Sequence, residues 1–461
     1  MRRLALVVVL VIAYAGCKEV DPAYCVNPAH VDYLSCSDGV GGGSCKSSSD
    51  CTITLSFPVC DTADNGGTCA VCTADDHQLC TGTTPLCKNH ACVACTSDSD
   101  CGTGGLCLPN GACAAPESII HVALTNAAVS TPCGSGISPP CQLATALAAV
   151  DSTRNVIKLD EAGNYATGGS PNFIVNADVT IDARKAVLHR TVDGPILSIS
   201  DNKTVTIYGG KIEGATGNTG DGILCNSGAT LTVDGTTINM SDKSAINASS
   251  GCKLTVKRAT ISDSSRKGGP FAASILAGGD SVTLMQSRLQ SNRGGGINVT
   301  SGTFVIVGNV LSNNGDVNSP NGGVTINTGP DPMNRMEFNS ISGNHVQSGL
   351  YPGVGCTAGV GFIARNNIIW NNNDNIGSQI GGNCKHAYSD IGATGVTAFN
   401  DGGNNLSLDP MFTSEFHVMS SSMVLKKADP NASLNGVAER DIDGDLRVAP
   451  ADIGADQVPR P

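Results

Sequence analysis

An eight-residue phrase that recurs at nearly constant intervals constrains the fold of this chain more than any other feature. It reads VTIYGGKI at 205–212, LTVDGTTI at 231–238, LTVKRATI at 254–261, VTLMQSRL at 282–289 and FVIVGNVL at 304–311. Looser copies are VTID at 179–182, MEFNSI at 336–341 and IARNNII at 363–369. A repeat with a period of roughly 20–50 residues indicates a stacked architecture, in which each unit buries its apolar face only against its neighbours.

The repeated phrase alternates apolar and polar residues and is rich in Val, Ile, Leu and Thr, which is typical of β-strands rather than helices. A second short apolar run lies between successive phrases, as in ILSI at 196–199 and GINVT at 296–300. Gly-, Asn- and Ser-rich corners separate the runs, as turns require. Together these features predict an all-β chain in which each repeat is one coil of a parallel β-solenoid. The leucine-rich repeat is the alternative, but it requires a Leu-x-x-Leu-x-Leu consensus that this sequence lacks.

A polar residue recurs three positions after the last hydrophobic residue of each phrase. On successive coils this residue is Ser241, Ser264, Asn292, Asn314, Asn344 and Asn372. Coils of a solenoid stack at roughly 4.8 Å, so equivalent side chains lie above one another. Because a side-chain amide can donate to one neighbour and accept from the other, the sequence predicts a structural asparagine ladder rather than a binding site.

The stretch before the repeats has the pattern of an amphipathic helix followed by a strand. In PPCQLATALAAV at 139–150, Leu143, Leu147 and Val150 recur on one helical face, and the apolar segment 156–165 follows. Such a helix would cover the open edge of the first coil.

The stretch after the repeats carries LSLDPMF at 406–412 and DIDGDLRVAPADIGA at 441–455. With the coil pattern and the upstream helix, these motifs resemble the right-handed parallel β-helix (pectin-lyase-like) superfamily, and the closing signature resembles its choice-of-anchor Q group. That signature usually ends Gly-Ala-Tyr-Glu, whereas this chain has Gly-Ala-Asp-Gln at 454–457. The resemblance covers about residues 118–457. It implies a right-handed parallel β-helix with an N-terminal capping helix and a closing segment from about residue 406.

The N-terminus reads as an export signal. Arg2 and Arg3 precede an apolar run at 4–15 that is too short to span a bilayer. Tyr-Ala-Gly-Cys at 14–17 resembles a bacterial lipobox, which predicts a signal peptide over 1–17 with acylation of Cys17. The chain would then be exported and anchored by its lipid to a bacterial membrane, at the outer membrane or cell surface. The alternative is ordinary cleavage near residue 15, with Cys17 in a disulfide.

Cysteine usage supports export. The chain has 21 cysteines, and an even number remains once Cys17 is set aside. Fourteen of them fall within 18–115, which predicts a disulfide-rich segment, or stalk, ahead of the solenoid. They divide into the pair Cys25–Cys36 and three four-cysteine units, Cys45/Cys51/Cys60/Cys69, Cys72/Cys80/Cys87/Cys92 and Cys95/Cys101/Cys107/Cys113. Zinc binding is the alternative for the short Cys-x-x-Cys spacings, but it needs thiolates that an exported chain does not keep reduced.

The remaining six cysteines form pairs that are local in sequence. The predicted disulfides are Cys133–Cys141, Cys225–Cys252 and Cys356–Cys384. The last two pairs are separated by about one coil, so each could join adjacent rungs. No thiol is then left over to act as a nucleophile.

Composition limits the classes of partner. The net charge is −12 and the chain contains one Trp, which argues against nucleic-acid binding. The partners that we expect are a membrane, reached through the N-terminal lipid, and a polysaccharide or envelope glycan. The sequence gives no reason to expect a cofactor or a metal.

Relatives of this fold cleave acidic polysaccharides, but the sequence lacks the motifs of that chemistry. The Asn-Thr-Asp, Asp-Asp, Gly-His-Gly and Arg-Ile-Lys motifs of polygalacturonases do not occur in order. No paired carboxylates of the kind that inverting hydrolysis needs stand out in the repeats, nor does the calcium-binding Asp cluster of pectate lyases. Asp441, Asp443 and Asp445 alternate around a Gly and could suggest calcium, but a structural turn explains them better, because a twelve-residue calcium loop would end in Glu where this chain has Asp452.

The best candidate for ligand binding is a row of basic residues beside the predicted ladder. Arg293 and His345 each follow a ladder Asn, and Arg266 and Lys267 lie at a similar corner. Such a row could bind a sugar carboxylate, for which Arg offers a two-pronged donor. Gly315 interrupts the row, and solvated corner charges are the alternative explanation.

These observations favour a lipid-anchored surface protein whose β-helix binds glycan or envelope without catalysis. One alternative is a polysaccharide lyase or glycoside hydrolase acting on uronate-containing chains, with catalytic residues that the sequence does not identify. A protein-docking adhesin is the other alternative.

Overall fold

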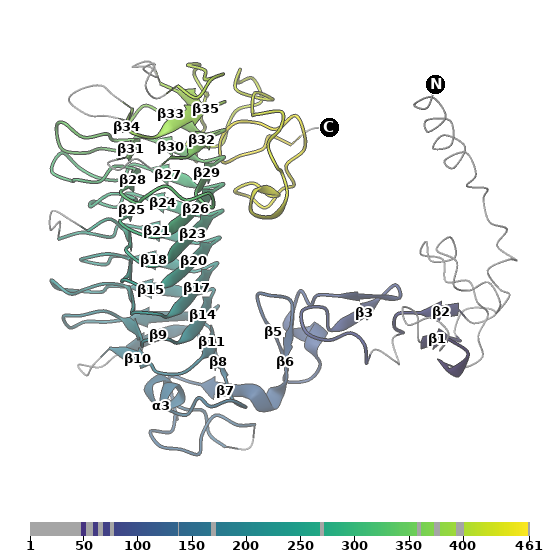
Figure 1. The fold of residues 1–461 in the computed structure, drawn as a ribbon. Coiled ribbons are helices and arrows are strands. Elements are labelled where there is room, and N and C mark those ends of the chain that lie inside the picture. The colour runs from purple at the N-terminus through teal and green to yellow at the C-terminus, as the bar shows by residue number, and fades with distance from the viewer. Residues whose placement is uncertain are drawn as a thin grey trace, which may run out of the picture. The chain divides into compact units, whose positions relative to one another are not determined.

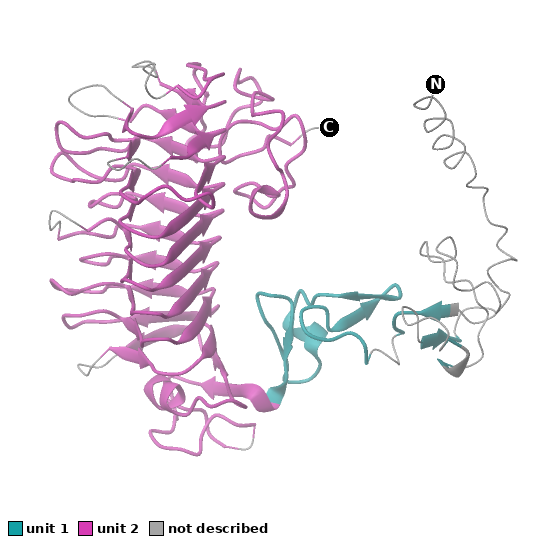
Figure 2. Ribbon diagram, viewed as in Figure 1, with its two compact units in different colours: residues 1–116 teal, residues 117–461 magenta. Residues whose placement is uncertain are grey.

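The computed structural model describes residues 48–51, 59–62, 68–73, 78–136, 138–166, 172–267, 272–356, 361–372, 379–392 and 401–459. The chain divides into two compact units, Met1–Pro116 and Glu117–Pro461 (Figure 2). The predicted signal peptide over 1–17, the predicted acylation of Cys17 and the predicted pair Cys25–Cys36 lie outside the described residues and stay predictions. Among the described residues, no helix is long and apolar enough to cross a membrane.

The first unit consists of short antiparallel hairpins that are joined by disulfides. Its strands pair as β1 (Val59–Asp61) with β2 (Thr68–Ala70), β3 (Leu86–Lys88) with β4 (Ala91–Val93), and β5 (Leu106–Cys107) with β6 (Cys113–Ala114). Two short 3₁₀ helices, η2 (Ser48–Cys51) and η3 (Asp98–Cys101), complete its regular structure among the described residues.

Disulfide connectivity in this unit follows one rule, which the cysteine spacing alone left open. In the second and third four-cysteine units, the first cysteine is bonded to the third and the second to the fourth. The bonds are Cys72–Cys87, Cys80–Cys92, Cys95–Cys107 and Cys101–Cys113, and Cys51–Cys69 joins the second and fourth of the first unit. These bonded sulfurs cannot act as zinc thiolates.

The second unit is a column of coils built from three parallel sheets (Figure 1). Sheet 1 contains β7 (Ile119–Val122), β8 (Val156–Leu159), β11 (Val179–Asp182), β14 (Thr204–Tyr208), β17 (Thr230–Asp234), β20 (Lys253–Lys257), β23 (Ser281–Met285), β26 (Thr303–Val307), β29 (Arg335–Glu337), β32 (Ile363–Arg365) and β35 (Lys385–Ala387). Sheet 2 contains β9 (Gly163–Ala166), β12 (Ala186–His189), β15 (Lys211–Glu213), β18 (Thr237–Asn239), β21 (Thr260–Ser262), β24 (Arg288–Gln290), β27 (Val310–Ser312), β30 (Ser340–Ser342), β33 (Ile368–Trp370) and β36 (Asp390–Ile391). Sheet 3 contains β10 (Phe173–Val175), β13 (Leu197–Ile199), β16 (Ile223–Cys225), β19 (Ile246–Ala248), β22 (Ile275–Ala277), β25 (Ile297–Val299), β28 (Val324–Ile326), β31 (Val354–Cys356) and β34 (Ile380–Gly382).

The eight-residue phrase supplies the strands of sheets 1 and 2, and the second apolar run supplies sheet 3. Pairing is parallel and in register, so equivalent residues form columns inside the coil. One column consists of Ile207, Val233, Val256, Leu284 and Ile306, none of which is exposed. Each such side chain contributes about 1.5–3 kcal/mol by leaving water. The alternation of apolar and polar residues is therefore the alternation of inward and outward side chains.

The helix before the first coils is shorter than the sequence predicts. Helix α3 spans Leu143–Ala148, the single α-helix among the described residues, rather than the whole of 139–150. Cys141 forms β-bridges with Val122 and Ala128 and a disulfide with Cys133, which keeps the preceding chain extended. Leu143 and Leu147 are buried in the solenoid's apolar core. A capping role for so short a helix stays a prediction.

The other two local cysteine pairs are also bonded. Cys225–Cys252 and Cys356–Cys384 each join a strand of sheet 3 to the corner that follows the sheet 3 strand of the next coil. A bridge of this kind stabilises a fold by about 2–4 kcal/mol, chiefly by restricting the unfolded chain.

The closing segment, residues 401–459, has little regular structure and packs against the outside of the later coils of the solenoid, here called the upper coils (Figure 1). Apart from the short η5 (Gly436–Ala438), it is held by isolated bridges such as Phe412 with Val418 and Arg440 with Leu446. Its apolar residues form a second core with the upper coils. This core includes Val307, Phe338 and Ile368 of the coils and Val418, Val424, Ala438 and Ile453 of the closing segment.

Candidate functional site

After each strand of sheet 2 the chain turns a corner. At this corner, one residue lies inside the coil and its neighbour lies outside. Met240, Asp263 and Ser291 occupy the same place in three successive corners and have φ angles of 54°, 49° and 56°. This left-handed conformation turns the chain sharply. The residue that follows each of them (Ser241, Ser264 and Asn292) is buried, whereas Arg293, next after Asn292, is exposed.

The predicted ladder asparagines form one continuous hydrogen-bonded stack. Nδ2 of Asn292 donates to Oδ1 of Asn314 (2.9 Å), Asn314 to Asn344 (3.0 Å), and Asn344 to Asn372 (2.8 Å). Each Nδ2 also donates to a backbone carbonyl of the adjacent coil on the other side of the stack, as Asn314 does to Leu289 at 2.9 Å. Gln379 ends the column by accepting from Asn372 at 3.0 Å. All of these amides are buried, so the stack holds the coils in register and is not available to a ligand.

A second asparagine column, which the sequence analysis missed, lies at the turn between sheets 1 and 2. Nδ2 of Asn309 donates to Oδ1 of Asn339 (3.0 Å), and Nδ2 of Asn339 to Oδ1 of Asn367 (2.9 Å). Ser287 below and Ser389 above continue the column through backbone contacts. The sequence does contain a signal for this column, because each of its asparagines precedes the last hydrophobic residue of the repeated phrase by two positions.

An open hollow of about 390 Å³ lies on the outer side of the three corners that carry Ser241, Ser264 and Asn292. Its lining residues come from three successive corners and are mostly polar. They are Asn239, Met240, Asp263, Ser264, Arg266, Ser291 and Arg293. Oδ1 of Asn239 is buried and has no hydrogen-bond partner among the described residues. The hollow therefore offers the guanidinium donors of Arg266 and Arg293, the carboxylate of Asp263 and the hydroxyl of Ser291 to a ligand.

The basic residues of the hollow are tied to carboxylates of neighbouring coils. Nε of Arg293 lies 2.7 Å from Oδ2 of Asp316, and its Nη1 donates to the carbonyl of Arg266 at 3.2 Å. Arg266 and Lys267 both approach Asp242, at 3.5 Å and 2.8 Å. These contacts leave the guanidinium groups of Arg266 and Arg293 about half exposed.

The neighbouring cations help to lower the pKa of the carboxylates that they contact. Burial acts to raise the pKa of Asp316, but the hydrogen bond from Arg293 and those from backbone amides outweigh it and lower the pKa. The pKa of Asp242 is lowered in the same way, with Lys267 and the amide of Gly217 opposing burial. Both carboxylates are therefore ionised at neutral pH.

The structure brings together two of the four predicted basic residues. Arg266 and Arg293 line the hollow, whereas Lys267 contacts Asp242 and is not a lining residue. His345 also lies outside the hollow, because Gly315 occupies the coil between it and Arg293. At Gly315 a Cβ would overlap the carbonyl of His345, so no side chain can bridge the gap. The predicted basic row is thus a pair.

The Asp-rich turn of the closing signature is a structural turn, as the sequence analysis favoured. Oδ1 of buried Asp441 accepts from the amides of Asp443 (3.0 Å) and Asp445 (2.8 Å), and its Oδ2 accepts from the amide of Gln457 (3.0 Å). Buried Arg447 stacks on the ring of Phe338, 4.6 Å from the centroid. The carboxylate of Asp441 is used in holding the turn, which speaks against an EF-hand-like calcium loop.

Comparisons with known proteins match this picture of two units. A model for right-handed β-helix regions matches residues 195–369, and a model for a family of unknown function, DUF8331, matches residues 15–119. A solved structure titled "Crystal structure of pectate lyase Pel9A" aligns with a TM-score of 0.52 at 17% identity, covering 74% of this chain and 96% of that chain. No curated protein matches the sequence.

The second unit is therefore a right-handed parallel β-helix of the pectate-lyase type of fold, preceded by a disulfide-rich segment. At this level of identity the likeness defines the fold and leaves the activity to be argued from the site.

Proposed function

We propose that this protein is an exported β-helix protein that binds a carboxylate-bearing polysaccharide at the hollow formed by Arg266 and Arg293, without cleaving it. The observation that carries the proposal is the hollow itself. Two half-exposed guanidinium groups on neighbouring coils face the same space as the exposed side chains of Asp263 and Ser291. A uronate offers a carboxylate for the guanidinium groups and hydroxyls for Ser291 and Asp263.

The charges of the hollow favour binding over cleavage. A lysine or arginine can act as a β-elimination base only after losing its proton, but an aspartate lies beside each of Arg266, Lys267 and Arg293. Of the described residues that line the hollow, Asp263 alone carries a carboxylate, whereas hydrolysis uses two. The alternative of a lyase or hydrolase would need residues elsewhere on the coils.

The proposal is tested by measuring retention and turnover together. The protein is titrated with trigalacturonate in a calorimeter, and the mixture is then assayed for unsaturated product and for new reducing ends. Each charge-assisted hydrogen bond contributes about 1.5–3 kcal/mol, so Arg266→Ala/Arg293→Ala is expected to weaken binding about tenfold or more.

Arg258→Ala is the matched control. Arg258 is as exposed as Arg293 (56% of the side chain) and is also paired with an aspartate, Asp234, but it lies outside the hollow. Native affinity in this variant and loss of affinity in the double variant support the proposal. Turnover that depends on Arg266 or Arg293 would make the protein an enzyme and contradict it, as would equal affinity in all variants.

The cell-surface setting is part of the same proposal. Export is supported by the disulfides of both units, which form outside the reducing cytoplasm. Anchoring through Cys17 rests on the lipobox-like stretch at 14–17, and the closing signature at 441–455 supports placement in the choice-of-anchor Q group. Radiolabelled palmitate incorporated by the native chain but not by Cys17→Ser tests the anchor. Equal labelling of both would contradict it.

A further inference from the structure

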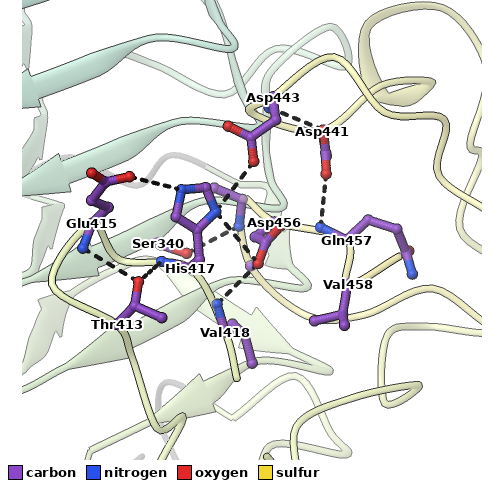
Figure 3. A network of polar contacts seen from close by, with 12 residues as sticks. Ser340, Thr413, Glu415, His417, Val418, Asp441, Asp443, Asp456, Gln457 and Val458 are labelled. Carbon is purple, nitrogen blue, oxygen red and sulfur yellow. Dashed lines mark hydrogen bonds and ion pairs between the residues drawn. The ribbon is translucent and has the colours of Figure 1, made fainter. Parts of the chain in front are cut away.

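Three metal-ligating side chains converge in the closing segment, at a place that the proposed glycan binding does not use (Figure 3). His417, Asp443 and Asp456 each present one ligand atom, and these atoms lie within 4.8 Å of one another. Nδ1 of His417 is 3.2 Å from Oδ2 of Asp443 and 3.7 Å from Oδ2 of Asp456. The imidazole nitrogen thus faces two carboxylates from two other stretches of the chain.

Hydrogen bonds fix the backbone around all three ligands. The backbone of His417 exchanges bonds with Thr413, whose amide donates to its carbonyl (2.8 Å) and whose hydroxyl accepts from its amide (3.2 Å). Asp443 sits on the turn that Asp441 holds together. Asp456 accepts from the amide of Val418 at 2.9 Å and is almost fully buried. The ligand set is therefore largely formed before any ion arrives, which lowers the cost of ordering it.

Three carboxylates gather around the imidazole of His417. Asp443 and Asp456 each direct a carboxylate oxygen at Nδ1 of His417. Glu415 adds a carboxylate 3.8 Å from Nε2 of His417. Arg288 of β24 is the facing cation from the coils, with Nη2 3.5 Å from Asp443 and 3.3 Å from Nε2 of His417. A divalent cation between the two aspartates would relieve this crowding.

We propose that His417, Asp443 and Asp456 form a binding site for a divalent transition metal of the zinc class. One imidazole nitrogen and two carboxylate oxygens are ligands that Zn²⁺ accepts, with water completing the set, whereas Ca²⁺ prefers six to eight oxygens. Binding at Nδ1 places the ring hydrogen on Nε2, where Glu415 can accept it. Arg288 then keeps its hydrogen bond to the carbonyl of Glu415 at 3.0 Å.

The bound ion would join three stretches of the closing segment to one another. His417 precedes the buried Val418, Asp443 belongs to the turn at 441–445, and Asp456 lies at the end of the closing signature. Because an ion that binds only the folded state stabilises it, metal and unfolding are linked. The departure of this signature from Gly-Ala-Tyr-Glu supplies Asp456, one of the ligands.

The test is zinc titration of the full chain with its disulfides intact. We compare the native protein with His417→Gln and Asp443→Asn by calorimetry, and we follow the thermal midpoint with and without Zn²⁺. Native protein is expected to bind one Zn²⁺ per chain at this site with a higher midpoint, and each variant to bind at least about tenfold more weakly. Asp443 is 44% exposed, so its variant is expected to fold even if His417→Gln does not.

Asp445→Asn provides the control, because Asp445 is an exposed carboxylate two residues from Asp443 and outside the ligand set. It should keep native zinc affinity and the native midpoint shift. Equal affinity in all four proteins would overturn the site, as would the absence of any zinc-dependent midpoint shift in the native chain. Displacement of zinc by an equal concentration of Ca²⁺ would overturn the assigned metal class. None of these outcomes bears on glycan binding, which the control Arg258→Ala tests separately.

Discussion

Asn292 and Arg293 are adjacent in sequence but lie on opposite sides of the same corner, and they do different work. Asn292 is buried, and its amide group bonds to both neighbouring coils. Arg293 is about half exposed and lines a hollow open to solvent. Ser291, the residue before them, has a left-handed backbone conformation. The turn that it makes places Asn292 inside the coil and Arg293 outside it. A corner of this solenoid therefore has an inner side that stabilises the fold and an outer side that is free to bind.

The same contrast applies to carboxylates. Asp316, on the outer side, has a lowered pKa because its cation and amide partners outweigh burial. Asp390, inside the last coil, has a pKa raised to about 6, chiefly by burial. On the inner side an unpaired polar group costs free energy, as Oδ2 of Asp390 does, whereas a group on the outer side can exchange a protein partner for a ligand.

The largest effect is expected from breaking the ladder in its middle. Asn314→Leu removes the acceptor that serves the backbone amide and Nδ2 of Asn292, and the donor to Asn344 and Leu289, so four buried hydrogen bonds are lost. Each unpaired group costs about 1–3 kcal/mol, so the free energy of unfolding should fall by about 3 kcal/mol or more. Denaturant titration measures this loss. Asn318→Ala, an exposed amide on the same coil, should change stability by less than about 0.5 kcal/mol, and an equal loss in both variants would refute the ladder's role.

A smaller, pH-dependent effect is expected from Asp390. Because its folded pKa lies above the ordinary 3.8, the folded state binds the proton more tightly. Its contribution to stability is therefore full below about pH 4 and is lost as pH rises through about 6, by about 3 kcal/mol at most. Asp390→Asn should remove this part of the pH dependence in denaturant titrations at pH 4, 6 and 8. An unchanged profile would mean that Asp390 is not buried as described.

On the outer side, removing a partner should strengthen binding instead of weakening the fold. Asp316→Asn releases Arg293 from its carboxylate. Because an exposed ion pair contributes about 1 kcal/mol or less, stability should barely change, while affinity for trigalacturonate should rise about two- to fivefold. Calorimetry measures the affinity. A weaker affinity would show that Asp316 orients Arg293 for the ligand, and the hollow as described would need revision.

The smallest effect is expected from extending the ladder by one coil. Ser264 occupies a ladder position and its amide already donates to Oδ1 of Asn292. Ser264→Asn adds an amide that can bond to both neighbours, and it should raise the free energy of unfolding by about 0.5–1 kcal/mol. A loss of stability in denaturant titration would mean that the lower coils pack too closely for Asn.

The regular part of the molecule could be predicted because every coil buries apolar side chains at equivalent positions. The strands, the first ladder and the three local disulfides of the solenoid follow from residues at fixed offsets, such as Asn314 after Leu311. The second column obeys the same logic at Asn339, but its Asn lies inside the strand phrase, where it looked like a turn residue. The helix at 143–148 is shorter than its pattern because Cys141 is held in bridges that the periodicity does not report.

The polar sites depend on parts of the chain that do not repeat. Arg266 is paired with Asp242 and Arg293 with Asp316, and both aspartates lie on corners of neighbouring coils whose lengths differ. His417 and Asp456 meet in a segment with almost no regular structure, so no period relates their positions. Spacing along the sequence does not determine such contacts, because they arise from how irregular loops pack.

The most direct test of the division between inner and outer side is a crystal structure of the protein soaked with trigalacturonate. The account predicts a uronate in the hollow, with its carboxylate within hydrogen-bonding distance of Arg266 or Arg293 and the Asn292–Asn314 hydrogen bond unchanged. A uronate bound elsewhere on the coils, with the hollow empty, would contradict it.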